Sequence, residues 1–378
     1  MKNSMTEVFI ASDNIVSPLG STTAENFRQL KENLSGIKQH NTSFSPQPFY
    51  ASLFEENSVY NVTGNYTKYE QLLIASISNA INNIEIDVKS EKTVLIISST
   101  KGNISLLETE TYNDNLKQRI SLYNSAKLIA DFFGFVHKPV VVSNACISGV
   151  LAMLTGMRML QSGQYENAVI AGADVISKFV LSGFQSFQAI SDEACKPFDA
   201  ERKGINLGEA AGTVILSSNK KFAGEIKLLG GAVSNDANHI SGPSRTGEEL
   251  SVAIKKALSN AAVSADAIDF ISAHGTATLY NDEMEAKALN ICGLEKVPVN
   301  SLKGYYGHTL GAAGLIESII TAHSMKENLL IPTRGFRETG VSQPINICST
   351  LQTASLNKCL KTASGFGGCN AALVLSKN

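Results

Sequence analysis

The sequence predicts an α/β protein made of two related halves in one fused body. Short runs of β-branched residues alternate with Ala-, Leu- and Met-rich stretches of helical length, which is typical of α/β folds with mostly parallel strands. A faint internal repeat accompanies this alternation. Residues 1–220 and 221–378 each contain a strand that turns into an apolar helix, and each closes with a similar strand, Gly208–Ser217 or Gly367–Ser376.

Strands are expected where Val, Ile and Leu cluster in short runs. In chain order these runs are Val8–Ala11, Val94–Ser98, Val140–Ser143, Ala168–Ala171, Gly212–Ser217, Ile226–Leu229, Asp269–Ala273, Val297–Ser301, Cys359–Ala363 and Ala371–Leu375. Helices are expected in the longer Ala-, Leu- and Met-rich stretches between them. These stretches are Thr23–Glu32, Tyr69–Ile81, Ser125–Phe132, Gly149–Ser162, Gly247–Asn260, Asn281–Ile291 and Gly311–Glu327.

Composition excludes several classes of protein. Apolar residues make up 43% of the 378 residues and charged residues only 17%, which describes a well-buried chain and not a disordered one. The 32 Lys and Arg nearly balance the 34 Asp and Glu, so no basic excess is present to bind nucleic acid. There is no signal peptide and no run of ~20 apolar residues that would span a membrane. Six cysteines without a Cys-x-x-Cys pair predict a cytoplasmic protein with reduced thiols and no zinc site.

Cys146 follows a predicted strand and precedes a helix that is apolar on nearly all sides. Such a helix must be buried, and the small residues Ala145, Ser148 and Gly149 permit a tight turn before it. A thiol at a helix N-terminus faces free backbone N–H groups and the positive end of the helix dipole, which favour the thiolate. Cys146 is therefore a candidate nucleophile on a strand–turn–helix elbow. A buried structural cysteine is the alternative.

His274 ends a predicted strand in the second half of the chain. A hydroxyl-rich turn with Thr276 and Thr278 follows it, and Asp282 or Glu285 is placed to cap or charge the next helix. A histidine at a strand end beside glycine suits a donor that faces a ligand. The alternative is a core histidine whose hydrogen bonds are satisfied internally.

A second histidine, His308, lies with Lys303 in a glycine-rich loop that leads into a helix. The run Gly311–Gly314 lets this helix approach another backbone closely. Glu317, about two turns inside the apolar helix, needs a cationic partner, for which Lys303 is the natural candidate. A phosphate-binding loop is the alternative, but the loop has neither Gly-Lys-Ser/Thr nor Gly-x-Gly-x-x-Gly.

Two further loops are rich in glycine. In Gly365–Gly368 the glycines surround Phe366, and the backbone freedom suits an oxyanion donor and an aromatic gate. A simple tight turn before the last strand is the alternative. The segment Pro197–Gly212 combines glycine with charge and is interpreted as a packed structural loop.

Taken in order, these motifs resemble the β-ketoacyl-[acyl-carrier-protein] synthase family, in its elongating Cys-His-His type within the thiolase superfamily. The resemblance covers essentially the whole chain. Cys146 matches the family's nucleophile. The family's other three motifs, His-Gly-Thr-x-Thr, Lys-x-x-x-Gly-His and Gly-Phe-Gly-Gly, fall on His274–Thr278, Lys303–His308 and Gly365–Gly368.

Some positions depart from the family pattern. Ile147 stands where Ser or Thr is usual, Ser364 replaces Phe, Cys369 replaces Thr, and Leu279 replaces Pro. The stretches around 38–68 and 101–130 are also abbreviated. In the family those stretches shape the acyl pocket and the dimer surface, so a chain-length preference is not carried over.

The resemblance implies a thiolase-like fold, in which two βαβαβαββ halves form a five-layered α-β-α-β-α body. It implies a decarboxylative Claisen condensation of an acyl thioester with malonyl-[acyl-carrier protein], through an acyl-Cys146 intermediate. The product is a 3-oxoacyl-[acyl-carrier protein], in fatty-acid synthesis or in specialised polyene or polyketide synthesis. The substrates are carried on the phosphopantetheine of the carrier protein, and no metal or other cofactor is expected.

The resemblance also implies roles for individual residues. Cys146 is the nucleophile, while neutral His274 and His308 donate hydrogen bonds to the enolate. Lys303 joins this catalytic set by holding the loop of His308. The supporting residues are Glu317, Asp282 and Phe366, and the residues expected to bind substrate are Thr276, Thr278, Gly365 and Gly367.

The implied partners are an acyl carrier protein and a second subunit, either a copy of this chain or a related ketosynthase-like chain. The segment Lys178–Gln188 matches a family segment near the subunit contact. Lys68, Arg202 and Lys203 are candidate docking residues for an acidic carrier protein.

Three alternatives are a catalytically minor, chain-length-setting subunit, a thiolase-type condensing enzyme and a starter-type Cys-His-Asn ketosynthase. Retention of Cys146, His274 and His308 counts against the first. The combination of His-Gly-Thr-x-Thr with Gly-His-x-x-Gly-Ala-Ala-Gly counts against the second, and His308 in the place of the Asn counts against the third.

Overall fold

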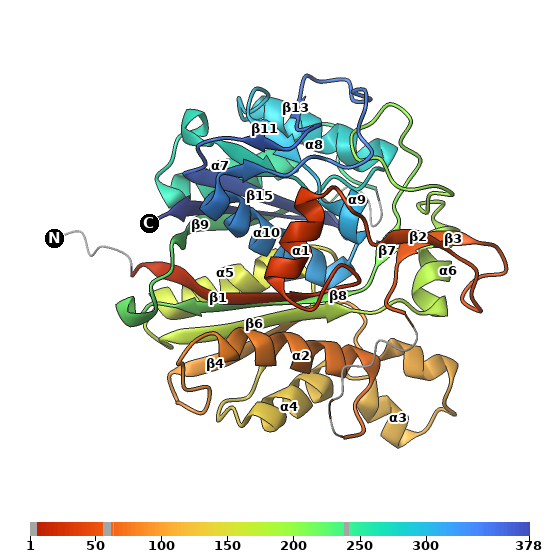
Figure 1. The fold of residues 1–378 in the computed structure, drawn as a ribbon, viewed down its shortest axis with the longest axis vertical. Helices are drawn as coiled ribbons and strands as arrows, with labels where there is room; N and C mark the ends of the chain where they lie inside the picture. The colour runs from red at the N-terminus through yellow and green to blue at the C-terminus, as the bar shows by residue number, and fades with distance from the viewer. Residues whose placement is uncertain (1–5, 56–61, 63, 238–241) are drawn as a thin grey trace.

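A computed structural model shows helices packed between and outside two layers of strands (Figure 1). The structure describes residues 6–55, 62, 64–237 and 242–378. Within these residues, eleven strands pair into one sheet in the order β13-β11-β10-β15-β16-β9-β1-β8-β6-β4-β5. The two layers are joined where β1 (Val8–Val16) pairs with β9 (Ile226–Asn235) through only two residues of each strand.

The strands of the first layer follow the order β5-β4-β6-β8-β1. If the five strands are numbered 1 to 5 along the chain, their spatial order is 3-2-4-5-1. The first two pairs are parallel and the last two antiparallel. The bounds are β4 (Thr93–Ser98), β5 (Val140–Val142), β6 (Asn167–Asp174) and β8 (Ala210–Ser217).

The second layer repeats this topology with β11-β10-β15-β16-β9. Numbered along the chain, these strands again have the spatial order 3-2-4-5-1. Two parallel pairs are again followed by two antiparallel pairs. The repeat expected from the sequence is therefore present in the strand order. The bounds are β10 (Phe270–Ser272), β11 (Pro298–Asn300), β15 (Lys358–Gly365) and β16 (Cys369–Lys377), with β13 (Asn346–Ile347) at the edge.

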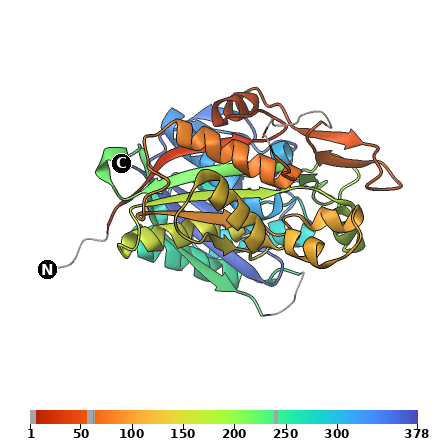
Figure 2. The same cartoon turned by 90° about the horizontal axis from the view of Figure 1, so that it is seen from below.

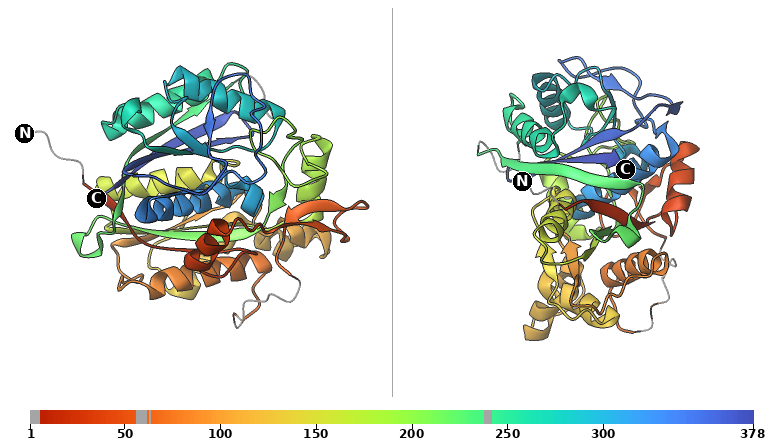
Figure 3. Two further views of the ribbon diagram at one scale, coloured as in Figure 1. Left: turned by 45° about the horizontal axis from the view of Figure 1, so that its top comes forward. Right: turned by 90° about the vertical axis from the view of Figure 1, so that its left-hand side faces the viewer.

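Helices complete five layers in the order α-β-α-β-α, as Figure 3 shows. The outer helices α2 (Lys68–Asn82) and α4 (Leu122–Phe133) cover the first layer of strands (Figure 2). On the other side, α7 (Glu248–Ala261) and α8 (Leu279–Ile291) cover the second layer (Figure 1). Strands therefore lie on both sides of the central pair, α5 (Ser148–Gln161) and α10 (Ala313–Glu327), which explains why both helices are apolar nearly all round.

The central helices approach each other closely at glycine. A Cβ atom on Gly149 would lie 2.5 Å from the backbone nitrogen of Leu315, and one on Gly314 would lie 2.6 Å from a methyl carbon of Val150. This contact brings the N-terminal ends of α5 and α10 together. Because Cys146 precedes α5 and His308 precedes α10, the contact also sets the distance between these two residues.

Every predicted strand and helix is present, with bounds that differ by one to six residues at an end. The expectation of mostly parallel pairing is wrong, because five of the ten pairs in the main sheet are antiparallel. In each half the last two strands, β6 and β8 or β15 and β16, pair antiparallel. Antiparallel pairing needs no helical crossover. Strands and α-helices that the sequence did not predict are β2 (Ile37–His40), β3 (Phe49–Ser52), β7 (Leu207–Gly208), α3 (Asp114–Arg119), α6 (Lys178–Ser186), α9 (Lys303–Tyr306), β12 (Leu329–Leu330), β13 (Asn346–Ile347) and β14 (Gln352–Thr353).

The helix α1 (Thr23–Lys31) shows how local sequence sets a boundary. Thr22 accepts a hydrogen bond from the backbone of Glu25, whose side chain in turn accepts from the backbone of Thr22. The same capping box starts α2 at Thr67. Within the described part of the chain, no helix has the length and apolar character needed to cross a membrane.

Candidate active site

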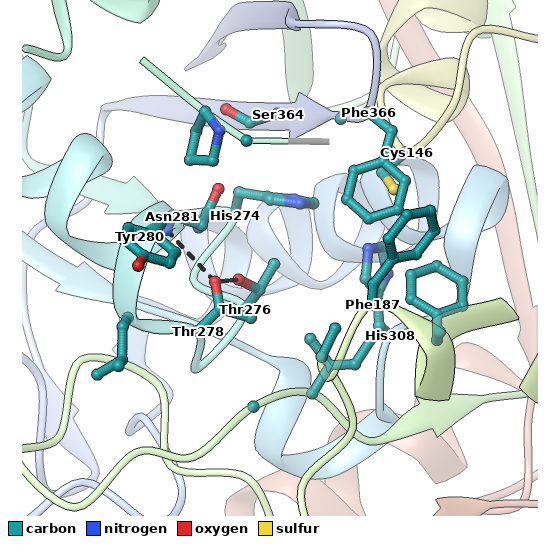
Figure 4. A pocket seen from close by; sticks show the side chains of 18 of the residues that line it. Cys146, Phe187, His274, Thr276, Thr278, Tyr280, Asn281, His308, Ser364 and Phe366 are labelled. Atoms are coloured by element: carbon teal, nitrogen blue, oxygen red, sulfur yellow. Dashed lines mark hydrogen bonds between the residues drawn. The ribbon is translucent and has the colours of Figure 1, made fainter. Parts of the chain in front are cut away.

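A cavity of about 360 Å³ contains the three residues expected to act in catalysis, Cys146, His274 and His308 (Figure 4). These residues follow β5, β10 and β11, and the gate loop follows β15. Within each half, the strands that precede these residues pair in parallel with their neighbours, so their carboxyl ends lie at one edge of the sheet. Residues that follow strands of both halves line the same cavity. The fold therefore gathers side chains that are far apart in sequence.

Cys146 lies on the predicted elbow between β5 and α5. The preceding residue, Ala145, has a φ of +44°, a left-handed conformation that non-glycine residues rarely adopt. Ser148 stabilises the turn, because its hydroxyl donates to the carbonyl of Ala145 at 2.6 Å and accepts from the backbone of Asn144 at 2.8 Å. Gly365 passes so close that a Cβ atom there would lie 2.9 Å from the nitrogen of Cys146. The elbow and the gate loop are thus packed against each other.

The thiol of Cys146 is protonated in this environment. Burial raises its pKa to about 12, while the charge of Lys303 and a backbone hydrogen bond to Phe366 act in the opposite direction. The helix N-terminus favours the thiolate, as expected from the sequence, whereas burial of the sulfur opposes it.

Both imidazoles are neutral and present an N–H to the cavity. The backbone N–H of Leu310 donates to Nδ1 of His308 at 3.2 Å, and Nζ of Lys303 lies 3.5 Å from Nδ1 of His274. Since each Nδ1 faces a donor, the ring proton resides on Nε2. Burial lowers the pKa of both rings well below 6.5, and Lys303 adds to this effect.

The sulfur and the two rings converge. The thiol of Cys146 and the ring nitrogens that face it all lie within 4.8 Å of one another. The ring centroids of His274 and His308 are 5.3 Å apart and nearly perpendicular. Figure 4 shows the three side chains pointing toward one another, with Thr276 and Thr278 farther along the cavity.

A buried ion pair lies behind the histidines. Nζ of Lys303 is 2.5 Å from Oε1 of Glu317 and donates to the carbonyl of His274 at 2.8 Å. The ion pair expected between these residues is therefore present. Sequence reasoning missed Lys361 on β15, whose Nζ lies 2.7 Å from Oε2 of the same glutamate. The available signal was a lysine in the middle of a predicted strand, between Leu360 and Thr362.

Two carboxylates of α8 shape the turn after His274. Glu285 accepts from the backbone of His274 and Gly275, both at 2.8 Å, and Asp282 accepts from that of Thr276 at 2.9 Å. Burial raises the pKa of Asp282 to about 6. Of the two roles expected for an acidic residue at the start of α8, the cap is taken by the side chain of Thr278, whereas Asp282 lies in the first turn and supplies negative charge there. The acidic side chains also bind the free N–H groups of the preceding turn.

The expected substrate-binding residues occupy different places. Thr276, Thr278 and Gly365 line the cavity, and the two threonine hydroxyls are hydrogen-bonded at 2.9 Å. Gly367, with a φ of +85°, belongs to the turn beyond the cavity wall and allows the loop to reverse.

Phe366 stands over Cys146 in an aromatic cluster that sequence reasoning missed. Its ring stacks on Phe184 at 5.7 Å and meets the edge of Phe187 at 5.4 Å. Both partners belong to α6 or its C-terminal cap, in the segment Lys178–Gln188. Phe187 is 56% exposed at the mouth of the cavity.

One of the three candidate docking residues is misplaced. Arg202 is buried, donates to the carbonyls of Asp199 and Gly340, and lies 3.9 Å from Asp282. It therefore cannot present its charge to a carrier protein, and its predicted docking role is wrong. Lys203 is 56% exposed and lines the cavity mouth, and Lys68 is half exposed beside Glu209. The local sequence could not show which of Arg202 and Lys203 is exposed, because only the tertiary structure turns Arg202 toward the interior.

Comparison with known proteins agrees with this geometry. Two family models match the chain, the N-terminal domain of β-ketoacyl synthase over residues 61–221 and its C-terminal domain over residues 226–337. The chain belongs to the β-ketoacyl synthase family.

Individual members extend the match to the whole chain. The 3-oxoacyl-[acyl-carrier-protein] synthase 2 of Vibrio cholerae is 27% identical over 98% of this chain and 99% of its own length. The synthase of the same name from Rhizobium meliloti is 32% identical over 62% of this chain and 60% of its own. Among solved structures, the ishigamide ketosynthase/chain length factor superposes with a TM-score of 0.91 at 25% identity, covering 99% of this chain and 100% of that one.

Proposed function

We propose that this β-ketoacyl synthase condenses an acyl thioester with malonyl-[acyl-carrier protein] to give 3-oxoacyl-[acyl-carrier protein] and CO₂. The observation that carries the proposal is the convergence within 4.8 Å of one thiol and one nitrogen from each of two neutral imidazoles, whose ring protons are on Nε2. A thiol is required to hold an acyl group, and two N–H donors are suited to an enolate oxygen.

The first step transfers the acyl group to the enzyme. The sulfur of Cys146 attacks the thioester carbonyl, the carbon–sulfur bond to pantetheine breaks, and the pantetheine sulfur takes up a proton. The developing oxyanion lies beside the backbone N–H groups of Cys146 and Phe366. Because burial holds the proton on the free thiol, this proton leaves as the substrate arrives.

The second step forms the carbon–carbon bond. Malonyl-[acyl-carrier protein] loses CO₂, and the electron pair of the broken bond becomes an enolate whose oxygen accepts from His274 and His308. The enolate carbon attacks the acyl carbonyl, and the sulfur of Cys146 leaves and regains a proton. Lys303 holds the carbonyl of His274 and so orients the ring. Thr276 and Thr278 line the path that a pantetheine arm would take.

The same three side chains have the spacing of a metal site, but their protons fit an anion. A metal bound through Nε2 would require each ring proton to move to Nδ1. Nδ1 of His308 already accepts from Leu310, and that of His274 faces the ammonium of Lys303. The site therefore supports an oxyanion, in agreement with the proposal that no metal or redox cofactor takes part.

We assign the nucleophile to residues 1–220 and both histidines to residues 221–378, and we place the protein in the cytoplasm. The proposed partners are an acyl carrier protein and a second ketosynthase-like subunit. A second candidate function, the chain-length-setting subunit of a heterodimer, is favoured by the similarity to the ketosynthase/chain length factor structure. The intact thiol and imidazoles favour the catalytic role.

The direct test is incubation with an acyl carrier protein charged with acyl and malonyl groups, followed by mass spectrometry. An acyl adduct on Cys146 and a 3-oxoacyl carrier product are expected. If neither forms with the chain alone or with a candidate partner subunit, the condensing function is incorrect. If product forms only with the partner and persists after Cys146→Ala, the chain is the chain-length-setting subunit.

A further inference from the structure

Two lysines share one buried glutamate behind the catalytic imidazoles. The two oxygens of Glu317 are each within 2.7 Å of an ammonium, Lys303 on one side and Lys361 on the other. Lys361 is 0% exposed. A lysine so completely buried is rare, because removal of its charge from water is costly unless ionic and hydrogen-bonding partners compensate. Its position lies outside the motifs that carry the family resemblance.

Lys361 is bound to the strand that ends at His274. Its Nζ contacts three backbone carbonyls, at 3.1 Å for Ser272, 3.2 Å for Ala273 and 2.7 Å for Thr362. The first two are the residues that immediately precede His274. Lys361 therefore ties the end of β10 to β15, and movement of that end would move the imidazole.

The charges around the imidazoles are balanced. Lys303 and Lys361 contribute two positive charges, while Glu317 and Glu285 contribute two negative charges. The ionisable groups on the elements packed around the two imidazoles are Cys146 before α5, Asp174 on β6, Lys303 on α9, Glu285 and Asp282 on α8, Glu317 on α10, Lys361 on β15 and Arg202 beside Asp282. Removing Lys361 would leave a net negative charge behind an enolate that is itself negative.

We propose that Lys361 is a positioning residue for condensation, which anchors the backbone of His274 and balances the carboxylates so that the enolate forms in a site without net negative charge. The proposal rests on the condensing function given above. After burial and Lys303, the ammonium of Lys361 also lowers the pKa of both imidazoles. Without it, the pKa of both rings would rise.

The test compares Lys361→Met with Lys358→Met, a control on the same strand whose side chain is partly exposed. We expect Lys361→Met to slow CO₂ release from malonyl-carrier protein roughly ten- to hundredfold at pH 8, which is the effect of one unit charge at a partly screened site. We expect a further loss of about threefold or more between pH 8 and pH 6, which the wild type and the control lack. Rates equal to wild type at both pH values would overturn the proposal.

A double variant separates charge from packing. Glu317→Gln combined with Lys361→Met removes one negative and one positive charge, so a balancing role predicts faster CO₂ release than in Lys361→Met alone. If the loss of rate in the double variant equals the sum of the losses in the two single variants, in free-energy terms, Lys361 acts only through packing and the proposal is overturned. If Lys361→Met does not fold, Lys361→Gln keeps an N–H donor without the charge and is measured in its place.

A readout that needs no activity keeps this inference apart from the proposed function. The ring C–H resonances of His274 and His308, followed by NMR in labelled protein, should titrate at higher pH in Lys361→Met than in wild type. If the wild type releases no CO₂ but the titrations shift, the proposed function fails and with it the role in condensation, while the electrostatic coupling of Lys361 to the imidazoles stands. If the wild type condenses normally and the titrations and rates coincide, the role of Lys361 fails alone.

Discussion

The backbone N–H of Leu310 donates a 3.2 Å hydrogen bond to Nδ1 of His308. Leu310 has a φ of +51°, and the next N–H, that of Gly311, donates to the buried carboxylate of Asp174 at 2.7 Å. Asp174 belongs to β6 in the first half of the chain, whereas His308 belongs to the second. The tautomer of His308 is therefore set by a loop that the other half of the protein holds in place.

His308→Ala should accept an acyl group on Cys146 but lose decarboxylation. The histidine acts on charge that appears only when the malonyl group loses CO₂, and removal of one such donor costs about 3 kcal/mol, or about 10²-fold in rate. Release of labelled CO₂ measures the effect. His323→Ala, which removes a histidine of α10 that pairs with Asp13, is the matched control. Decarboxylation by His308→Ala at the wild-type rate would contradict the assigned role.

Cys146→Ala should lose acylation but keep decarboxylation. Acyl transfer requires the sulfur, so acylation and condensation should be abolished. Decarboxylation needs only a bound malonyl thioester and the two N–H donors, so CO₂ release should remain measurable. Cys292→Ala, at a half-buried cysteine that ends α8, should behave as wild type. A 3-oxoacyl product from Cys146→Ala would point to another nucleophile, with Cys369 beside the gate loop as the first to test.

The reactivity of Cys146 should depend on pH as expected for a thiol whose pKa is raised to about 12. Burial disfavours the thiolate, so the rate of alkylation by iodoacetamide should keep rising, about tenfold per unit, from pH 7 past pH 9. Mass spectrometry of the peptide that contains Cys146 follows the reaction. Lys303→Met should slow it further, because a favourable positive charge is lost. A plateau below pH 8 would show instead that the helix N-terminus dominates.

Arg202 and Lys203 should differ despite their adjacency. Arg202→Ala removes a buried cation beside Asp282 and should lower the free energy of unfolding by about 3 kcal/mol, measured by urea denaturation. Lys203→Ala should leave it almost unchanged, since the side chain is exposed. Lys203→Glu should instead raise KM for the carrier protein and weaken its dependence on salt. Equal stabilities for the two alanine variants would contradict the buried placement of Arg202.

The active species should contain at least two ketosynthase-like subunits. The resemblance to the family implies that a neighbouring subunit helps close the acyl pocket and that Lys178–Gln188 lies near that contact. Sedimentation combined with an activity assay, on the chain alone and with a related subunit, separates a homodimer from a heterodimer. An active monomer at nanomolar concentration would disprove the expectation.

Much of this site could be predicted from the amino-acid sequence, because its chemistry lies at strand ends. Cys146, His274 and His308 each follow a short β-rich run and precede small residues and a helix, and their spacing carries the family motif. The repeat of the two halves implies that these strand ends meet. Motifs thus determined which side chains would come together.

Only the tertiary structure decided what surrounds those side chains. Lys361 occupies a strand position that local sequence cannot distinguish from one facing water, and Arg202 differs from Lys203 only in the direction of its side chain. The raised pKa of Cys146 also depends on the tertiary structure, because loops of both halves exclude water from the sulfur. Local sequence sets turns, caps and motif spacing through contacts between near neighbours. Burial and the balance of buried charge are sums over residues distant in the chain, so they exist only once the two halves have packed.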